Sequence, residues 1–298
     1  MSTPQRPQKQ HYSGTYFVQD RENEEELARL VNQDRLVTAS MGGVLPEQPN
    51  PGAFQRVLDV ACGAGSWVIE AAQTYPGMSL VGVDINQRMI EYARAQAAAH
   101  HVNDRVEFHV MDALSILDFP DASFDLVNLR FAVSFVRTWD WPKVLSEMLR
   151  VACPEGVVRL TDEEIIHQSS SPASMQFCEM LLCALFRSWH LFAQESNGLT
   201  AHLASLLNRR GCKQVQTRAH ALQYQAGTPE GQAYIEDGAR VLRTLRPFIQ
   251  KWGCMSEDFD AIREQALEET QRPDFCATWH LLTAWGIKSG SKSQQPQP

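Results

Sequence analysis

Apolar and polar positions along the first half of the chain predict strands and helices in alternation. Short apolar runs predict strands at 56–61, 79–83, 105–110, 124–129 and 156–161. Segments with helical periodicity predict helices at 66–75, 87–100 and 142–152. Alternation of this kind predicts an α/β fold, in which a doubly wound, mostly parallel sheet carries helices on both faces.

After residue 161 helices interrupt this series. We expect helices at 173–192, 199–210, 229–252 and 257–270, and strands at 213–224 and 276–287. The helices within 173–192 and 229–270 are inserted where a scaffold commonly carries the walls of a substrate site, so we interpret them as a helical cap. A plain extension of the core is the alternative.

One folded domain is expected over 12–288, with its core at 56–161. The tails at 1–11 and 289–298 are rich in Gln, Pro, Ser and Lys and are expected to be disordered. An amphipathic helix is predicted in the segment 12–42, where apolar residues recur at helical spacing at Leu27, Leu30, Val31 and Val37. We interpret this segment as a lid.

Composition and charge narrow the class of protein. With 298 residues, of which 44% are hydrophobic, the chain can bury a core without a disulfide or metal staple. A net charge of −8 disfavours a nucleic-acid partner. The seven cysteines contain no CxxC pair, and no signal peptide or membrane span is found. We therefore expect reduced thiols, a cytoplasmic location and a small-molecule ligand, with a homo-oligomer left open.

The strongest chemical signal is a glycine-rich turn between the first strand and the first helix. Gly63 and Gly65 allow backbone N–H groups to approach a ligand, and the helix that follows offers partial positive charge. Asp84 ends the second strand, at the place where an acid binds ribose hydroxyls. Val68 stands where the dinucleotide fingerprint needs a third glycine, which argues against a nicotinamide-dependent oxidoreductase.

Two further acids extend this signal. Asp59 lies in an apolar strand four residues before the glycine turn, and Asp112 ends the third strand. Together, Asp59-x-x-x-Gly63-x-Gly65, Asp84 and Asp112 resemble the class I S-adenosylmethionine-dependent methyltransferases, most of all the small-molecule enzymes of quinone biosynthesis. The resemblance covers 56–161 and implies a Rossmann-like sheet of seven strands, in which the last strand, at 275–288, is antiparallel.

The resemblance also implies S-adenosylmethionine as cofactor, S-adenosylhomocysteine as product, and roles for individual residues. Asp59 and the glycines would hold the methionine end, Asp84 the ribose, and Asp112 the adenine amine. Asn128 and Arg130 lie at the end of the fourth strand, where the family's backbone meets the cofactor's amino group. Further contacts are expected from Ala61, Ile85 and Ala113, and from Tyr16, which would close over the cofactor.

The expected reaction is methyl transfer to a small apolar or aromatic molecule at oxygen, nitrogen or carbon. The sulfonium methyl is strongly electrophilic, so the protein mainly aligns the acceptor, with a base needed where the acceptor carries a proton. His167 follows the fifth strand at the ligand-binding edge and is the candidate base, with a surface role as the alternative. The acids at 162–164 are interpreted as a solvated loop, so no metal is expected.

Two other functions stay open at this point. A nicotinamide-dependent oxidoreductase shares the glycine turn and the ribose acid. A cofactor-retaining interaction module without catalysis would use the inserted helices as a partner surface. A DNA amino-methyltransferase is disfavoured, because Asn128-Leu-Arg-Phe131 lacks the Asn/Asp-Pro-Pro-aromatic motif.

Overall fold

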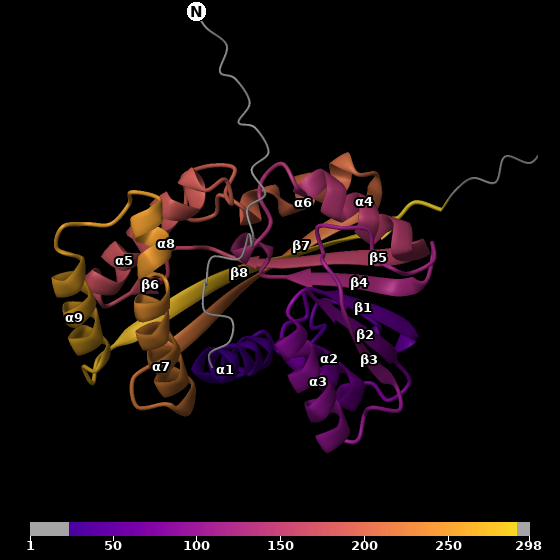
Figure 1. Ribbon diagram of the computed structural model, residues 1–298, viewed down its shortest axis with the longest axis horizontal. Coiled ribbons are helices and arrows are strands. Elements are labelled where there is room, and N and C mark those ends of the chain that lie inside the picture. Colours follow the sequence, from indigo (N-terminus) through magenta and orange to yellow (C-terminus); the bar gives the residue numbers. More distant parts are fainter. Residues whose placement is uncertain (1–23, 291–298) are drawn as a thin grey trace, which may run out of the picture.

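The computed structural model describes residues 24–290, which form a mixed sheet of eight strands between layers of helices (Figure 1). The strands are β1 (Arg56–Val60), β2 (Ser79–Asp84), β3 (Val106–Val110), β4 (Phe124–Arg130), β5 (Ala152–Glu163), β6 (Gln168–Ser169), β7 (Cys212–Gln225) and β8 (Cys276–Lys288). Their order is β3-β2-β1-β4-β5-β8-β6, and β7 pairs with β8 as well.

Strands β1 to β5 are parallel to one another, and β8 runs antiparallel to β5. The predicted fold class and the antiparallel last strand are therefore confirmed. The sheet has one strand more than expected, because β8 extends past the end of β5. Its backbone groups at Ala277 and Thr278 there pair with the two residues of β6.

Nine helices occur in the described part of the chain. They are α1 (Glu24–Ser40), α2 (Ser66–Thr74), α3 (Gln87–Ala99), α4 (Trp141–Val151), α5 (Pro172–Arg187), α6 (Leu203–Arg209), α7 (Pro229–Thr244), α8 (Arg246–Lys251) and α9 (Phe259–Thr270). Helices α1 to α3 cover one face of the sheet and α4 and α6 the other (Figure 1). Helices α5, α7, α8 and α9 gather at one end (Figure 1), and this group of helices is called the cap below. None of these helices is long and apolar enough to span a bilayer.

Three predicted helices have different bounds, for local reasons. The helix expected at 229–252 is divided into α7 and α8, because Pro247 has no N–H to continue the first of them. Helix α5 ends at Arg187 rather than 192, and Trp189 then has a left-handed backbone with φ of 68°. The helix expected at 199–210 begins as a 3-10 turn at Thr200–His202 before α6.

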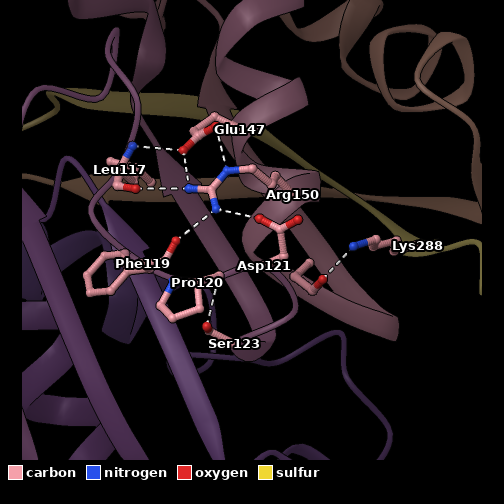
Figure 2. Close-up of polar contacts among 9 residues, drawn as sticks. Leu117, Phe119, Pro120, Asp121, Ser123, Glu147, Arg150 and Lys288 are labelled. Carbon is pink, nitrogen blue, oxygen red and sulfur yellow. Dashed lines mark hydrogen bonds and ion pairs between the residues drawn. The ribbon is translucent and has the colours of Figure 1, made fainter.

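Arg150 on α4 fixes the connection from β3 to β4 (Figure 2). Its guanidinium donates to the carbonyl oxygens of Leu117 and Phe119, at 2.9 and 2.8 Å, and to the carboxylate of Asp121 at 2.8 Å. Glu147, one turn earlier on α4, binds Arg150 and also accepts the backbone N–H of Leu117 at 2.7 Å. These bonds hold in place the segment that leaves the carboxyl end of β3.

The expectation that all cysteines are reduced is wrong for one pair. Cys183 on α5 and Cys254 after α8 form a disulfide with a Cα–Cα distance of 5.9 Å, while the other five cysteines are free. The two residues are 71 positions apart, so only the packing of the cap brings them together. The disulfide also removes one of the arguments for a reducing, cytoplasmic location.

Loss of this disulfide should destabilise the cap. A disulfide typically contributes about 2–4 kcal/mol to the free energy of unfolding, so we expect Cys254→Ser to lower that energy by this amount in urea titrations. Cys276→Ser, at an exposed free thiol, is the matched control. Alkylation of both Cys183 and Cys254 in unreduced protein, seen by peptide mass spectrometry, would show that the bond does not form in solution.

Candidate active site

A cavity of about 360 Å³ lies where the carboxyl ends of the parallel strands meet the cap helices. Crevices at this edge are the usual ligand sites of open α/β sheets. The cavity lining includes nine of the twelve residues singled out from the sequence: Asp59, Ala61, Gly63, Asp84, Ile85, Asp112, Ala113, Arg130 and His167. Gly65 and Asn128 lie outside the lining, and Tyr16 lies outside the described residues.

The glycine turn is shaped by left-handed backbone conformations. Ala61, Gly63 and Gly65 have φ values of 57°, 53° and 76°. The Gly63 N–H donates to Asp84 Oδ2 at 3.0 Å, and the Asn86 N–H donates to Asp84 Oδ1 at 2.8 Å. Asp84 therefore joins the turns that follow β1 and β2. The strained φ of Ala61 at a cavity wall is typical of a functional site.

The two glycines have different surroundings. A Cβ atom on Gly63 would meet no other atom within 4 Å, although Gly63 lines the cavity. A Cβ atom on Gly65 would lie 2.6 Å from the Phe108 ring and 2.8 Å from Ala93. Gly63 therefore leaves space for a ligand, whereas Gly65 allows α2 to pack closely on β3 and α3.

Asp59 is buried and belongs to a row of polar side chains that crosses three strands. Asn128 lies opposite Asp59 in the sheet, and Arg159 lies opposite Asn128. Asn128 Nδ2 donates to Asp59 Oδ1 at 2.8 Å, and Arg159 donates to Asn128 Oδ1 at 2.8 Å and to Glu47 at 2.7 Å. Asn128 was expected at the cofactor, but it is fully buried and orients Asp59 from behind.

This burial changes the acidity of Asp59. Desolvation raises the pKa of the carboxyl to about 7, although the charge of Arg130 and the hydrogen bond from Asn128 act in the opposite direction. Near neutral pH the side chain therefore holds its proton part of the time. A cationic ligand group in the cavity would favour its ionised form.

Arg130 lines the cavity and also attaches α1 to the end of β4. Its guanidinium forms an ion pair with Asp34 and donates to Thr38 Oγ1 at 3.2 Å. The same group lies 5.8 Å from the Trp67 ring centre. The sequence indicated Arg130 but not its partner Asp34, although Asp34 and Thr38 are one turn apart on the predicted helix and so share a face.

Asp112 follows β3 and caps its own loop. Its Oδ1 accepts the Leu114 N–H at 2.9 Å, and its Oδ2 accepts the Ser115 hydroxyl at 3.1 Å. Ile85, after the neighbouring strand β2, is 53% exposed, which is high for a large apolar side chain next to a cavity. Asp112 and Ile85 both line the cavity on its β2–β3 side.

An aromatic wall continues the cavity from β4 to the cap. Phe131, in a left-handed conformation with φ of 54°, stacks on Trp279 of β8 with ring centres 6.1 Å apart. The ring of His167 lies 4.9 Å from Trp279, and its Nδ1 is 2.7 Å from the hydroxyl of Tyr234 on α7. Sequence reasoning indicated His167 but missed Tyr234, which lies 67 residues away.

The far end of the cavity is apolar and comes from the cap. Helices α5, α7 and α9 contribute Phe177, Leu181, Leu185, Leu242 and Leu267, and Leu245 follows the end of α7. One cavity thus joins a polar compartment at the strand ends to an apolar compartment between helices. This arrangement suits a polar cofactor and a small apolar partner in the same space.

Comparisons with known proteins agree with this geometry. Residues 57–156 match the family model described as a methyltransferase domain. The chain is 31% identical over 154 residues to demethylmenaquinone methyltransferase of Symbiobacterium thermophilum, an alignment that covers 51% of this chain and 59% of that protein. The predicted resemblance of residues 56–161 to the class I S-adenosylmethionine-dependent methyltransferases is therefore confirmed.

Two further similarities extend over more of the chain. It is 28% identical to 27-O-demethylrifamycin SV methyltransferase of Amycolatopsis mediterranei over 256 residues, which is 86% of this chain and 79% of that protein. Phosphoethanolamine N-methyltransferase 2 of Haemonchus contortus, solved with S-adenosyl-L-methionine, has a TM-score of 0.54 at 20% identity, covering 94% of this chain and 61% of that one. At 20% identity, the similarity to the Haemonchus contortus protein shows the fold alone.

The residues present fit the family's cofactor, S-adenosylmethionine. The open space at Gly63 leaves room beside the turn, and Asp59, Asp84 and Asp112 offer carboxylates along one wall. The nicotinamide alternative gains no support from these relatives, and the position of the third glycine is occupied by Val68, which is fully buried.

Proposed function

We propose that this methyltransferase transfers a methyl group from S-adenosylmethionine to a small apolar or aromatic molecule. The observation that carries the proposal is that one cavity holds both the strand-end carboxylates and an apolar compartment built by α5, α7 and α9. A cavity with two compartments of this kind can hold a polar donor and an apolar acceptor side by side.

Cofactor contacts are proposed along the strand ends. Asp59 and Gly63 would hold the methionine end, Asp84 the ribose and Asp112 the adenine amine. Ala61, Ala113 and the backbone of Arg130 would border the cofactor, and Ile85 would cover the adenine, which accounts for an exposed apolar side chain at that place. Gly65 and Asn128 would act indirectly, by shaping the turn and orienting Asp59.

The bound cofactor supplies an electrophilic methyl group, so the chain's own task is alignment and exclusion of water. Helix α1 lines the cavity through Leu30, Gln33 and Asp34, and its ion pair with Arg130 would hold it over the cofactor. Tyr16 is proposed to close over the site. A cytoplasmic location remains part of the proposal.

Calorimetric titration tests cofactor binding. We expect tight binding of S-adenosylhomocysteine and none of NADH. Asp84→Ala and Gly63→Val should each abolish binding, because the first removes the ribose acceptor and the second fills the space beside the turn. Asp104→Ala, at an exposed carboxylate, is the control. Near-normal binding in both site variants would contradict the assignment.

Activity is tested separately, by incubating the enzyme with labelled cofactor and an extract of the producing cells. The expected result is a small molecule heavier by one labelled methyl group, found by mass spectrometry. Tight cofactor binding without any labelled product would instead support the non-catalytic interaction module.

A further inference from the structure

We propose that the acceptor is an aromatic molecule with an ionisable hydroxyl group, that its oxygen receives the methyl, and that His167 is the base, positioned by Tyr234 and Glu163. The inference rests on the proposed function and adds the substrate class and the proton acceptor. It comes from a group of polar side chains that line the cavity, namely Glu163, His167 and Tyr234.

The imidazole of His167 is held from several elements. Its Nδ1 is 2.7 Å from the Tyr234 hydroxyl on α7, and its Nε2 is 4.0 Å from Glu163 Oε2 at the end of β5. Trp279 of β8 packs against its ring. The side chains of His167 and Glu163 keep 21% and 22% of their surface exposed, and both line the cavity.

The partners of the two ring nitrogens define their roles. Burial raises the pKa of the Tyr234 hydroxyl well above its ordinary value, so Tyr234 stays a neutral phenol. In the proposed arrangement His167 Nδ1–H donates to Tyr234, which leaves the lone pair of Nε2 free to accept a proton. Glu163 then stabilises the imidazolium, because its carboxylate lies close to Nε2.

A base at this place favours a hydroxyl acceptor over an amine. The nitrogen of a neutral amine has a lone pair that attacks a methyl group unaided. A hydroxyl oxygen is a poor nucleophile in apolar surroundings unless its proton leaves as the new bond forms. The apolar side chains of α5, α7 and α9 would pack against the acceptor's ring.

The step balances in charge and atoms. The acceptor oxygen forms a bond to the methyl carbon while the carbon–sulfur bond breaks and its electron pair stays on sulfur. The hydroxyl proton passes to His167 Nε2. One positive charge thus moves from sulfonium to imidazolium, next to Glu163, and the proton is later released to solvent.

Matched probes test the substrate class. We expect the enzyme to convert 1-naphthol and 2-naphthol to their methyl ethers, and any methylation of the corresponding naphthylamines not to depend on His167. Methylation at a ring carbon, methylation of the amines but not of the naphthols, or no methylation of any probe would overturn the proposal. Binding of S-adenosylhomocysteine is measured in parallel, so that a failure of the proposed function is recognised by the absence of binding.

Substitution tests the base. His167→Gln should lower kcat for the naphthols by about 10²–10⁴-fold, the usual contribution of a general base, and leave binding of S-adenosylhomocysteine intact. Tyr234→Phe should lower kcat about tenfold with KM little changed, as expected when one orienting hydrogen bond is lost. His109→Gln and Tyr75→Phe, outside the cavity lining, are the controls. An unchanged kcat in His167→Gln would overturn the assignment.

A spectroscopic measurement tests the hydrogen bond between His167 and Tyr234 in the absence of turnover. In ¹⁵N-histidine-labelled protein, His167 should be the Nδ1–H tautomer at a pH where it is neutral, and Tyr234→Phe should reduce the share of that tautomer. Tyr75→Phe should leave the spectrum unchanged. If the unsubstituted protein has the Nε2–H tautomer, Nε2 has no lone pair to accept the proton and the proposed role of His167 is wrong.

Discussion

Gly65→Ala should destabilise the fold severely, whereas Gly63→Ala, two residues away, should leave the protein folded and weaken cofactor binding. Both residues have positive φ, so each substitution carries a backbone cost of about 1–2 kcal/mol. The difference comes from the space around each new methyl group. At Gly63 it points into open space, while at Gly65 it would overlap Phe108 and Ala93.

Phe108 cannot move away from a methyl group at Gly65. Its ring is buried, and it also lies within 2.7 Å of the place where a Cβ on Gly82 would be. The ring is therefore enclosed between two glycines on neighbouring segments. Overpacking of this kind adds about 1–3 kcal/mol to the backbone cost, against a typical total stability of about 5–15 kcal/mol for a domain.

Urea unfolding and calorimetry with S-adenosylhomocysteine separate the two effects. Phe108→Leu should partly restore the stability of Gly65→Ala, because the smaller side chain leaves room for the methyl group, and should not improve binding in Gly63→Ala. Equal stability of the two glycine variants would show that the close packing at Gly65 is not a constraint in solution.

The strand-end acids were predictable because parallel topology alone brings them together. Once apolar runs alternate with helices, the carboxyl ends of β1, β2 and β3 must share one edge. Asp59, Asp84 and Asp112 are then neighbours whatever the details of packing. The position of each residue in the motif was therefore sufficient to place these three at the cavity.

Position in the motif was not sufficient for every residue. Asn128 is in the expected strand, but its side chain points into the buried polar row rather than the cavity. Gly65 is in the expected turn, but the lack of a side chain serves packing there. The direction in which a side chain faces depends on the register and twist of the sheet, which the motif does not encode.

Partners that are distant in the sequence could not be found for a different reason. Tyr234, Asp34 and the Cys183–Cys254 pair owe their positions to contacts between segments that are far apart in the chain. Helical periodicity predicts the existence of α5 and α7 but not the angle at which they meet. Contacts between inserted helices follow from that angle.

The carboxyl of Asp59 is buried, and burial makes its ionisation costly. Its pKa is about 7 in the folded protein against an ordinary value of 3.8. Between these two pKa values the Asp59 carboxyl is protonated in the folded state and ionised in the unfolded state. The free energy of unfolding therefore falls as the pH rises from about 4 to about 7. Asn at this position has no charge to bury, and its Oδ1 can still accept from Asn128.

Asp59→Asn should consequently stabilise the protein without cofactor while it weakens cofactor binding. The gain in the free energy of unfolding should be small near pH 4, grow up to pH 7 and then stay constant. Its upper limit is ~4 kcal/mol, because the pKa of Asp59 is raised by about three units. Urea titrations at pH 5, 6, 7 and 8 measure it, with Asp118→Asn, at an exposed position, as control. A gain that does not depend on pH would contradict this origin.

Binding should show the opposite dependence on pH. The ammonium group at the cofactor's methionine end favours the ionised carboxylate, so affinity should rise with pH until about 7, where Asp59 ionises in the free protein. Below that pH binding must release a proton, which calorimetry detects as a dependence of the heat on the buffer. Asp59→Asn should remove this proton release together with most of the affinity. If the release persists in Asp59→Asn, another group supplies the proton and the burial of Asp59 is not what couples binding to pH.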